Sequence, residues 1–355
     1  MLWRGYRETT LNAELDRWVE RQLAPWRGAD FDGDAVGPCF DAMNANDKDF
    51  FVLEARGRDV AVREKKNFYA DLTSAVAHDQ VAARAFIYKT MLQRALEENR
   101  LSIHATIGLD VADFVIERPF PVFSFQKPEG QNNLLLPDVD FFGHFWYPWP
   151  LVDSGSGKTI PDPPFEQKLT SAIFAGASTG RGGLLSVDDI MEATIPRLHY
   201  AKVLDGNRRI IFKICRAVQC DSSAQQMLEQ ESYFAPPIGL EEQLRHKFLI
   251  SIDGNGATCS RLVIALKSNS VLVKFKSPHR LYYFDGLVEG RDYLSISDER
   301  DLETIVAEEE RRPGTYRQIA QNGKTFCATY LTAEAGHRYV AKLLKAYEAA
   351  LGLRL

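Results

Sequence analysis

The amino-acid sequence predicts an α/β fold with parallel strands, and two patterns carry this prediction. Residues 247–277 have the order strand, turn, helix and strand, which is the crossover unit of a parallel sheet. From residue 172 onwards, short apolar runs rich in β-branched residues alternate with amphipathic helical patterns. The 355 residues, of which 45% are hydrophobic, are enough to bury the cores of two domains.

The first hundred residues are mainly helical in pattern. Apolar side chains recur at helical spacing in 11–26, and the Ala- and Leu-rich stretch 67–99 predicts two further helices. Between these segments, the apolar runs 50–53 and 60–62 flank Gly57. They predict a short pair of strands.

Short strands are expected after residue 101, and Asp110 follows the first of them. The alternating segment 102–107 and the compact apolar run 121–125 both have strand character. Ligands of open α/β sheets bind outside the carboxyl ends of the strands, so the Asp110 carboxylate is well placed to face a cleft. The alternative is that Asp110 caps the segment after it, because Asp is a favoured N-cap.

The segment 132–163 is rich in aromatic residues and prolines. Prolines exclude a long helix here, and aromatic rings at the rim of a cleft stack well on sugar rings. The candidate carbohydrate contacts in this segment are Asp138, Asp140, His144 and Trp146. A small aromatic core beneath a loop is the alternative. Residues 154–159 lack the first glycine of a phosphate loop and are interpreted as an interdomain linker.

A second set of elements begins at residue 172. A strand at 172–174 leads into a glycine-rich turn that carries Arg181, and Ser186 caps a helix expected at 187–193. The Arg181 guanidinium is suited to a pyrophosphate, because it binds bidentately and stays charged. An exposed loop arginine is the alternative. The next expected elements are a strand at 210–214 and helices at 223–232 and 240–246.

The crossover unit contains the most informative turn of the chain. Its first strand ends at Asp253-Gly254-Asn255-Gly256, and a helix is expected at 257–267 before the strand that starts at 271. Two glycines before a helix N-terminus let backbone N–H groups approach an anion, which suits a phosphate. Many such turns have no ligand, so this alternative stays open. Beyond the unit we expect helices at 281–287, 299–311 and 339–351 and a strand at 293–296.

Composition and charge argue against several classes of protein. The net charge of −5 disfavours nucleic acid as a partner. Five cysteines without a CxxC pair predict reduced thiols rather than disulfides or a zinc site. The chain lacks a phosphate-loop lysine motif and a GxGxxG fingerprint, which disfavours a kinase or a dehydrogenase. No signal-peptide core or bilayer-length run is present, so we expect a cytoplasmic protein, with peripheral association at a membrane as an option for the terminal helix.

Three blocks of the sequence resemble a known family and occur in that family's order. They are residues 121–125, residues 174–181, and the crossover unit with its segments 253–256, 260–262 and 266–274. In these blocks the chain resembles glycosyltransferase family 90. This family contains fungal capsule-associated xylosyltransferases, animal protein O-glucosyltransferases and bacterial lipopolysaccharide-modifying enzymes.

The resemblance implies a GT-B type of α/β fold, with two Rossmann-like domains that face each other across a cleft. The acceptor-side domain, with a helical N-terminal region, would cover residues 1–155. The nucleotide-sugar-binding domain would cover residues 165–335. Residues 336–355 would form a C-terminal helix that packs back across the domains.

The resemblance also implies the reaction. It is the inverting transfer of a hexose or pentose from a UDP-sugar to a hydroxyl of a glycan or lipid-linked glycan, without a cofactor or metal ion. Asp110 matches the catalytic aspartate of the family, and residues 132–163 would bind the acceptor. The implied donor contacts are Gly176, Ser178, Arg181, Gly254, Asn255, Gly256, Ala257, Ser260 and Arg261.

Two departures from the family pattern keep alternatives open. Ala175 stands where the family usually has an arginine, and His279 lies where many members have an acidic and aromatic segment. A catalytically silent sugar-binding or scaffold protein of the same fold is therefore one alternative. A protein O-glycosyltransferase is another, although a chain without disulfides fits bacterial lipopolysaccharide or capsule biosynthesis better.

Overall fold

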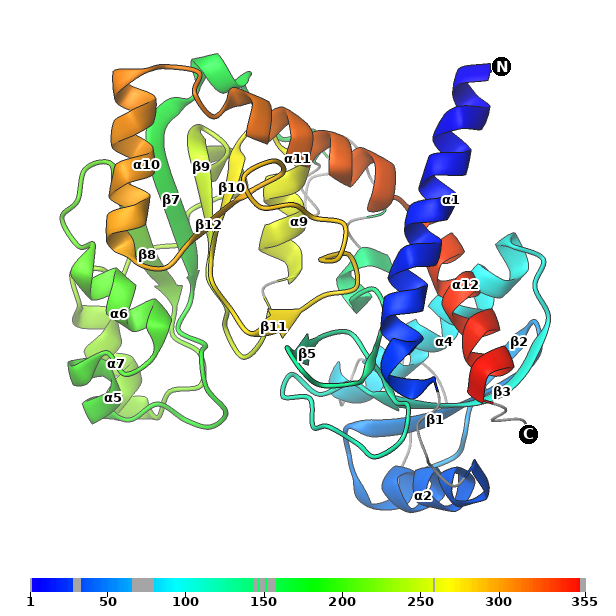
Figure 1. The fold of residues 1–355 in the computed structure, drawn as a ribbon. Helices are drawn as coiled ribbons and strands as arrows, with labels where there is room; N and C mark the ends of the chain where they lie inside the picture. Colours follow the sequence, from blue (N-terminus) through cyan, green and yellow to red (C-terminus); the bar gives the residue numbers. More distant parts are fainter. Residues whose placement is uncertain are drawn as a thin grey trace. The chain divides into compact units, whose positions relative to one another are not determined.

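The computed structural model describes residues 2–27, 33–65, 80–142, 146, 151, 158–257 and 259–351. It contains two compact units (Figure 1). The first unit comprises Met1–Tyr147, His279–Gly286 and Thr329–Leu355, and the second comprises Pro148–Pro278 and Leu287–Ala328. Each unit has a sheet of its own with helices packed against it, so the predicted α/β class is confirmed.

The sheet of the first unit is mixed. Its strands, in spatial order, are β2 (Asp59–Val62), β1 (Phe50–Gly57), β3 (Ile103–Asp110), β4 (Phe123–Ser124) and β6 (Leu134–Leu135). The antiparallel pair β2–β1 confirms the short pair of strands predicted around Gly57. The pair β1–β3 is also antiparallel, whereas β3–β4 and β4–β6 are parallel. This sheet therefore differs from a fully parallel, doubly wound one, and Asp110 is the last residue of β3.

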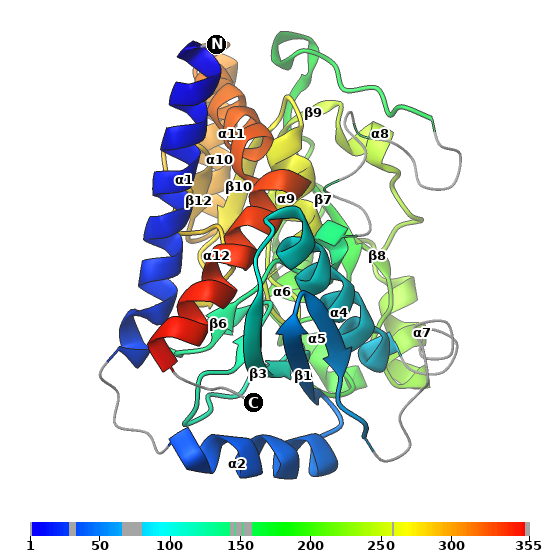
Figure 2. The same cartoon turned by 90° about the vertical axis from the view of Figure 1, so that its right-hand side faces the viewer.

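Within the described residues of the first unit, four helices pack together. They are α1 (Leu2–Leu23), α2 (Gly33–Asn46), α4 (Gln80–Glu98) and α12 (Ala333–Leu351), and a short 3₁₀ turn, η1 (Ala24–Trp26), follows α1. The helix α12 runs beside α1 and packs against α4 and β3 (Figure 2). The helix α2 packs where Phe40 meets Phe50 and Gly108. Of the region 67–99, only the part from residue 80 is described, and it forms one helix.

The segment 279–286 contains most of residues 281–287, where a helix was expected, and this expectation was wrong. It forms β11 (His279–Arg280), which pairs with β5 (Lys127–Pro128), and then a series of turns. Tyr282 and Tyr283 are buried against Phe141. Gly286 lies against the ring of Trp18, where a Cβ atom would clash. Packing of these aromatic rings therefore determines the backbone conformation here, although the apolar spacing suggested a helix.

The sheet of the second unit is parallel throughout. Its spatial order is β12 (Leu294–Ile296), β10 (Val271–Phe275), β9 (His246–Ser251), β7 (Leu169–Ala177) and β8 (Ile210–Arg216). The chain starts at β7, moves to β8 on one side, and then returns to β9 on the other side of β7. The carboxyl ends of β7 and β9 therefore form the topological switch point, where open α/β sheets bind ligands.

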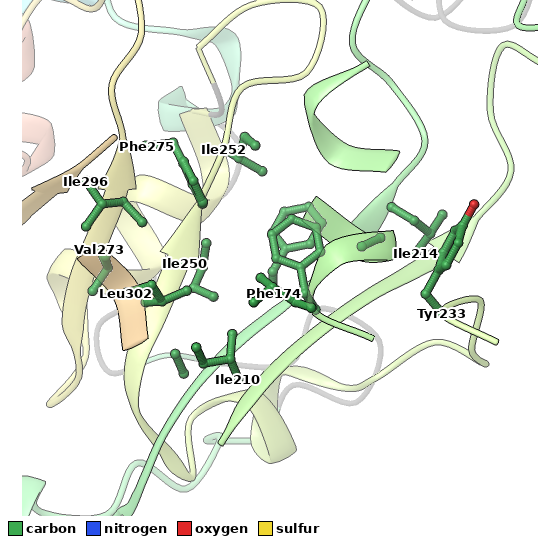
Figure 3. Packing of buried hydrophobic residues seen from close by; sticks show 14 of the residues in the cluster. Phe174, Ile210, Ile214, Tyr233, Ile250, Ile252, Val273, Phe275, Ile296 and Leu302 are labelled. Carbon is green, nitrogen blue, oxygen red and sulfur yellow. The ribbon is translucent and has the colours of Figure 1, made fainter. Parts of the chain in front are cut away.

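Helices cover both faces of this sheet. They are α5 (Val187–Glu192), α6 (Pro196–Val203), α7 (Ser222–Gln230), α8 (Leu240–Gln243), α9 (Cys259–Lys267), α10 (Glu299–Arg311) and α11 (Arg317–Tyr330), with a short η3 (Phe165–Gln167) before β7. Figure 3 shows part of the buried core of this unit, to which the strands contribute Phe174, Ile250 and Val273 and α10 contributes Leu302. The helix α9 connects β9 to β10, so the crossover unit predicted from the sequence is confirmed.

Within the described part of the chain, no helix combines the length and the apolar character needed to cross a membrane.

Candidate functional site

A cavity of about 740 Å³ lies in the second unit at the carboxyl end of β7. This volume is typical of sites for small ligands. Its walls come from β7, β8 and β9 and from the helices α8 and α9. The polar residues that line it are Thr179, Arg197, Arg216, Gln243, Ser260 and Arg261. Among the described residues that line it, the cavity thus has three guanidinium groups and no carboxylate.

Arg261 lies in the first turn of α9 and lines this cavity. Its Nη1 donates to Oε1 of Gln243 at 2.8 Å and its Nη2 donates to the carbonyl of Ala175. The guanidinium also lies 4.8 Å from the centre of the Phe174 ring. Burial lowers its pKa to about 10, so it still carries a positive charge at neutral pH. None of the described carboxylates forms an ion pair with it.

Arg197 of α6 connects the two strand ends at the switch point. Its Nη1 donates to the carbonyl of Ala177 at 3.0 Å, and its Nη2 donates to the carbonyl of Ile252 at 3.0 Å. Further bonds from the same guanidinium reach Thr179 and the carbonyl of Asp253. Burial, together with the neighbouring Arg261, lowers its pKa to about 10. Arg197 therefore adds positive charge next to the turn that follows β9.

Gly254 fits closely between two of these groups. A Cβ atom at this position would come within 2.5 Å of Thr179 Oγ1 and 2.9 Å of Arg197 Nη2, so only glycine fits without a shift. The Gly254 amide donates to the carbonyl of Gly256 at 3.1 Å, which closes the turn before α9. Among the described residues, Oδ1 of Asn255 is buried without a hydrogen-bond partner. Gly256 and Ala257 are buried next to it.

The other predicted donor contacts lie in different surroundings. Gly176 and Ser260 line the cavity. Ser178 is fully buried, and its hydroxyl exchanges hydrogen bonds with the backbone of Val218, so it ties the end of β7 to the loop after β8. Arg181 is not among the lining residues. It is half exposed and forms an ion pair of 2.7 Å with Asp189 in α5.

Asp110 lies in the first unit at the end of β3, and its side chain is buried. Its Oδ1 accepts a hydrogen bond from the amide of Ala112 at 3.0 Å, and its Oδ2 lies 3.8 Å from Arg118 Nη2. Burial raises the pKa of this carboxyl group to about 6. A carboxylate whose pKa lies near neutral pH is typical of a general base.

The predicted acceptor contacts are only partly described. Asp138 is buried, and its Oδ1 accepts from the amide of Asp140, so the two residues form one turn. Trp146 is 6% exposed and packs against Gly336 and the His337 ring, 4.6 Å away, as part of the core. Its placement corresponds to the aromatic core that was the alternative for this segment. His144 lies outside the described residues.

Arg197 and Gln243 are site residues that sequence reasoning missed. Arg197 follows Pro196 and is flanked by Ile195 and Leu198, both buried. The sequence pattern that could have indicated Arg197 is a charged residue on the apolar face of a short helix, because such a residue needs buried partners. In the described part of the chain, no three His, Cys, Asp or Glu side chains lie close enough to hold a metal ion.

Comparisons with known proteins cover parts of the chain. The model of the family described as glycosyl transferase family 90 matches residues 110–354. The chain is similar to "Uncharacterized protein 179R" of Invertebrate iridescent virus 6, with 26% identity over 203 residues. That match covers 51% of this chain and 17% of the viral protein. A solved structure, "Crystal structure of GtfA/B complex", matches 53% of this chain and 38% of its own chain, with 15% identity and a TM-score of 0.32.

Proposed function

The chain belongs to glycosyl transferase family 90, and from this premise we propose that it transfers a hexose or pentose from a UDP-sugar to a hydroxyl of a glycan, with inversion at the anomeric carbon. The family assignment supports glycosyl transfer. The resemblance in the three sequence blocks supports the UDP-sugar and the inverting course. Synthesis of bacterial lipopolysaccharide or capsule is the role proposed for this activity, and a lipid-linked glycan is the proposed acceptor.

The observation that carries the proposal is the partly buried Arg261 in the cavity at the switch point. Its guanidinium is charged, lines a cavity of about 740 Å³, and has neutral partners in Gln243 and Ala175. Partial burial of a charge without an acidic partner is costly, and an anionic ligand would offset this cost. The diphosphate of a nucleotide sugar is an anion that fits this charge and this position.

The cavity also has positive charge beside Ala175, one of the two departures from the family pattern. Ala175 stands where the family usually has an arginine, and the guanidinium of Arg261 binds the Ala175 carbonyl. Positive charge is thus present beside this position, although residue 175 does not supply it. This arrangement favours a nucleotide-binding transferase over a silent scaffold.

Stabilisation of the departing diphosphate is the first requirement of the proposed reaction. Arg261 and Arg197 provide fixed positive charge at the switch point, and the amides of the Gly254 turn precede a helix N-terminus. Preorganised groups of this kind stabilise charge that develops in the transition state. We therefore assign the role of stabilising the leaving group to these side chains and amides, and the proposed mechanism requires no metal ion.

Activation of the acceptor hydroxyl is the second requirement. A hydroxyl group is a weak nucleophile at neutral pH, so a base must take its proton as the oxygen attacks the anomeric carbon. Asp110 is the proposed base, since it matches the family's catalytic aspartate and burial raises its pKa to about 6. This role requires a GT-B arrangement, in which the loop after β3 reaches the bound donor, and we include that arrangement in the proposal.

The test is Asp110→Asn, with UDP binding measured by calorimetry and turnover measured as hydrolysis of UDP-glucose, UDP-xylose and UDP-galactose. Loss of a general base reduces turnover by roughly 100-fold or more, whereas UDP binding in the other unit should be unchanged. Asp113→Asn is the matched control, because Asp113 is half exposed and pairs with Arg84. Full turnover in Asp110→Asn would exclude Asp110 as the base.

Stability gives an independent readout for the same variant. The pKa of Asp110 rises from 3.8 to about 6 on folding, so the folded state binds this proton more tightly than the unfolded state does. Stability therefore falls as pH rises through this range, and the penalty is complete above pH 6. A shift of this size corresponds to on the order of 3 kcal/mol. Asp110→Asn should thus be more stable than the wild type at pH 7.5 while it loses activity.

A further inference from the structure

Asp110 is surrounded by a cluster of charged residues in the first unit. The turn after α2 contributes Asp47 and Asp49, and the loop after β3 contributes Arg118. The Val111 amide donates to the carbonyl of Asp49 at 2.9 Å, which holds the end of β3 against this turn. We call Asp47, Asp49, Asp110 and Arg118 the Asp110 cluster. It contains three carboxylates and one guanidinium.

Arg118 lies between two carboxylates of this cluster and is closer to one of them. Its Nη2 donates to Asp47 Oδ2 at 2.7 Å, whereas Asp110 Oδ2 is 3.8 Å away and beyond hydrogen-bond distance. Among the described residues, Arg118 Nε is buried without a hydrogen-bond partner. The guanidinium therefore makes its short contact with Asp47 and leaves Asp110 with a weaker interaction.

We propose that Asp47 is a positioning residue that holds Arg118 away from Asp110 and so keeps the Asp110 carboxyl basic enough to accept a proton. This inference rests on the proposed function, in which Asp110 is the base. If Arg118 bonded Asp110 directly, it would stabilise the ionised carboxylate and weaken it as a base. The negative charges of Asp47 and Asp49 act in the opposite direction, because like charges disfavour ionisation of their neighbour.

The remaining charged groups near Asp110 have other partners. Lys65 Nζ donates to the carbonyls of Phe50 and Asp47, and Arg84 Nη1 donates to the carbonyl of Val111 and to the carboxylate of Asp113. Of the groups that act on the pKa of Asp110, burial raises it most, Arg118 lowers it, and Asp47 and Asp49 raise it. Substitution of Asp47 or Arg118 can therefore change the pKa of Asp110 without a change in its burial.

The experiment measures the titration of Asp110 directly in the full chain. Carboxyl carbons of aspartate are labelled with ¹³C, and the Asp110 signal is identified by its loss in Asp110→Asn. Asp47→Asn removes a like charge and frees Arg118 to bond Asp110, so the midpoint should fall by about one pH unit or more. Arg118→Met removes the opposite charge, so the midpoint should rise by about one unit. Arg118→Lys retains the charge and should restore most of the wild-type value.

A purely structural role would not shift the two midpoints in opposite directions. Asp16→Asn is the control for the carboxylate-to-amide change, because Asp16 forms an exposed ion pair with Lys342 in the same unit. An unchanged or raised midpoint in Asp47→Asn would overturn the inference. The double variant Asp47→Asn/Arg118→Met adds a second criterion. If Asp47 acts through Arg118, Asp47→Asn lowers the midpoint much less in this background than in the wild type.

Kinetics then separates this inference from the proposed function. The acid limb of kcat/KM for hydrolysis of UDP-glucose should move with the Asp110 midpoint, to lower pH in Asp47→Asn and to higher pH in Arg118→Met. If the midpoints move and the acid limb stays in place, Asp47 still controls Asp110, but Asp110 is not the base. If the acid limb moves while the midpoints stay, the positioning role of Asp47 is excluded.

Discussion

At the scale of single residues, the structure distinguishes two arginines that the sequence presents alike. Arg181 lies within a glycine-rich turn, Arg261 follows one, and both suit a diphosphate. Arg181 is half exposed and paired with Asp189, whereas Arg261 is partly buried in the cavity and, among the described residues, bonds neutral groups. Spacing along the chain predicts the loop on which an arginine lies. It does not predict the partner, because the partner comes from a distant element.

Arg261→Met tests this distinction by its effect on UDP binding. The variant removes a charged donor from the cavity while it roughly preserves the volume of the side chain. A hydrogen bond to a charged group contributes about 1.5–3 kcal/mol, so the Kd for UDP should rise by roughly 10- to 100-fold. Titration calorimetry with UDP measures this change.

The matched control for this experiment is Arg245→Met. Arg245 precedes β9, is exposed, and pairs with Glu242 outside the cavity. Its loss should leave the Kd within about twofold, since an exposed pair contributes little. Equal affinities in Arg261→Met and the wild type would place the diphosphate elsewhere in the protein.

At the scale of secondary structure, the crossover unit was the most predictable part of the chain. Its strands are short continuous apolar runs, and the Gly254 turn separates them from an amphipathic helix, so local pattern and long-range packing agree. The helices α2, α6 and α11 were missed. Glycines and a proline within α2 and the few residues of α6 obscure helical periodicity, and tertiary packing provides what the local pattern lacks.

Ser186 provides a test at the same scale. It begins α5 with a capping box, in which its hydroxyl accepts from the Asp189 amide and the Asp189 carboxylate accepts from the Ser186 amide. Ser186→Ala should lower the free energy of unfolding by about 1 kcal/mol, because the first turn loses this partner. Urea denaturation measures the change. Ser223→Ala in the first turn of α7 is the control, since Asp221 caps that helix and Ser223 is exposed. Equal losses in the two variants would argue against the cap.

At the scale of the whole molecule, the composition of the units was the least predictable feature. The chain passes between the units at 147/148, 278/279, 286/287 and 328/329. A strand pair between Lys127–Pro128 and His279–Arg280 brings the short segment 279–286 into the first unit. Hydrophobic periodicity describes only near neighbours in sequence. It therefore predicts that α12 is amphipathic, but it does not predict that α12 packs on β3 and α4.

Leu343→Ala in α12 should destabilise strands that lie more than two hundred residues earlier in the sequence. Leu343 is fully buried in the first unit. Truncation of a buried leucine costs about 2–5 kcal/mol. Hydrogen exchange should show faster exchange in β3 and α4 and little change in β7 and β9.

The control is Lys345→Ala, on the exposed face of the same helix, which should change stability by no more than about 0.5 kcal/mol. An equal loss of protection in both units after Leu343→Ala would contradict the prediction that the effect is confined to the core of the first unit.

The late position of α12 has a consequence for biosynthesis. The ribosome makes β1, α4 and β3 well before Tyr339, Leu343 and Tyr347 of α12, which bury part of the sheet that contains β1 and β3. Between residues 147 and 333 the ribosome needs on the order of ten to forty seconds. During this time β7 to β10 emerge and can fold, while the earlier sheet remains without its cover. The strands β1 and β3 are therefore synthesised before β7 to β10 but receive their cover after them, and nascent chains should depend on chaperones during this interval.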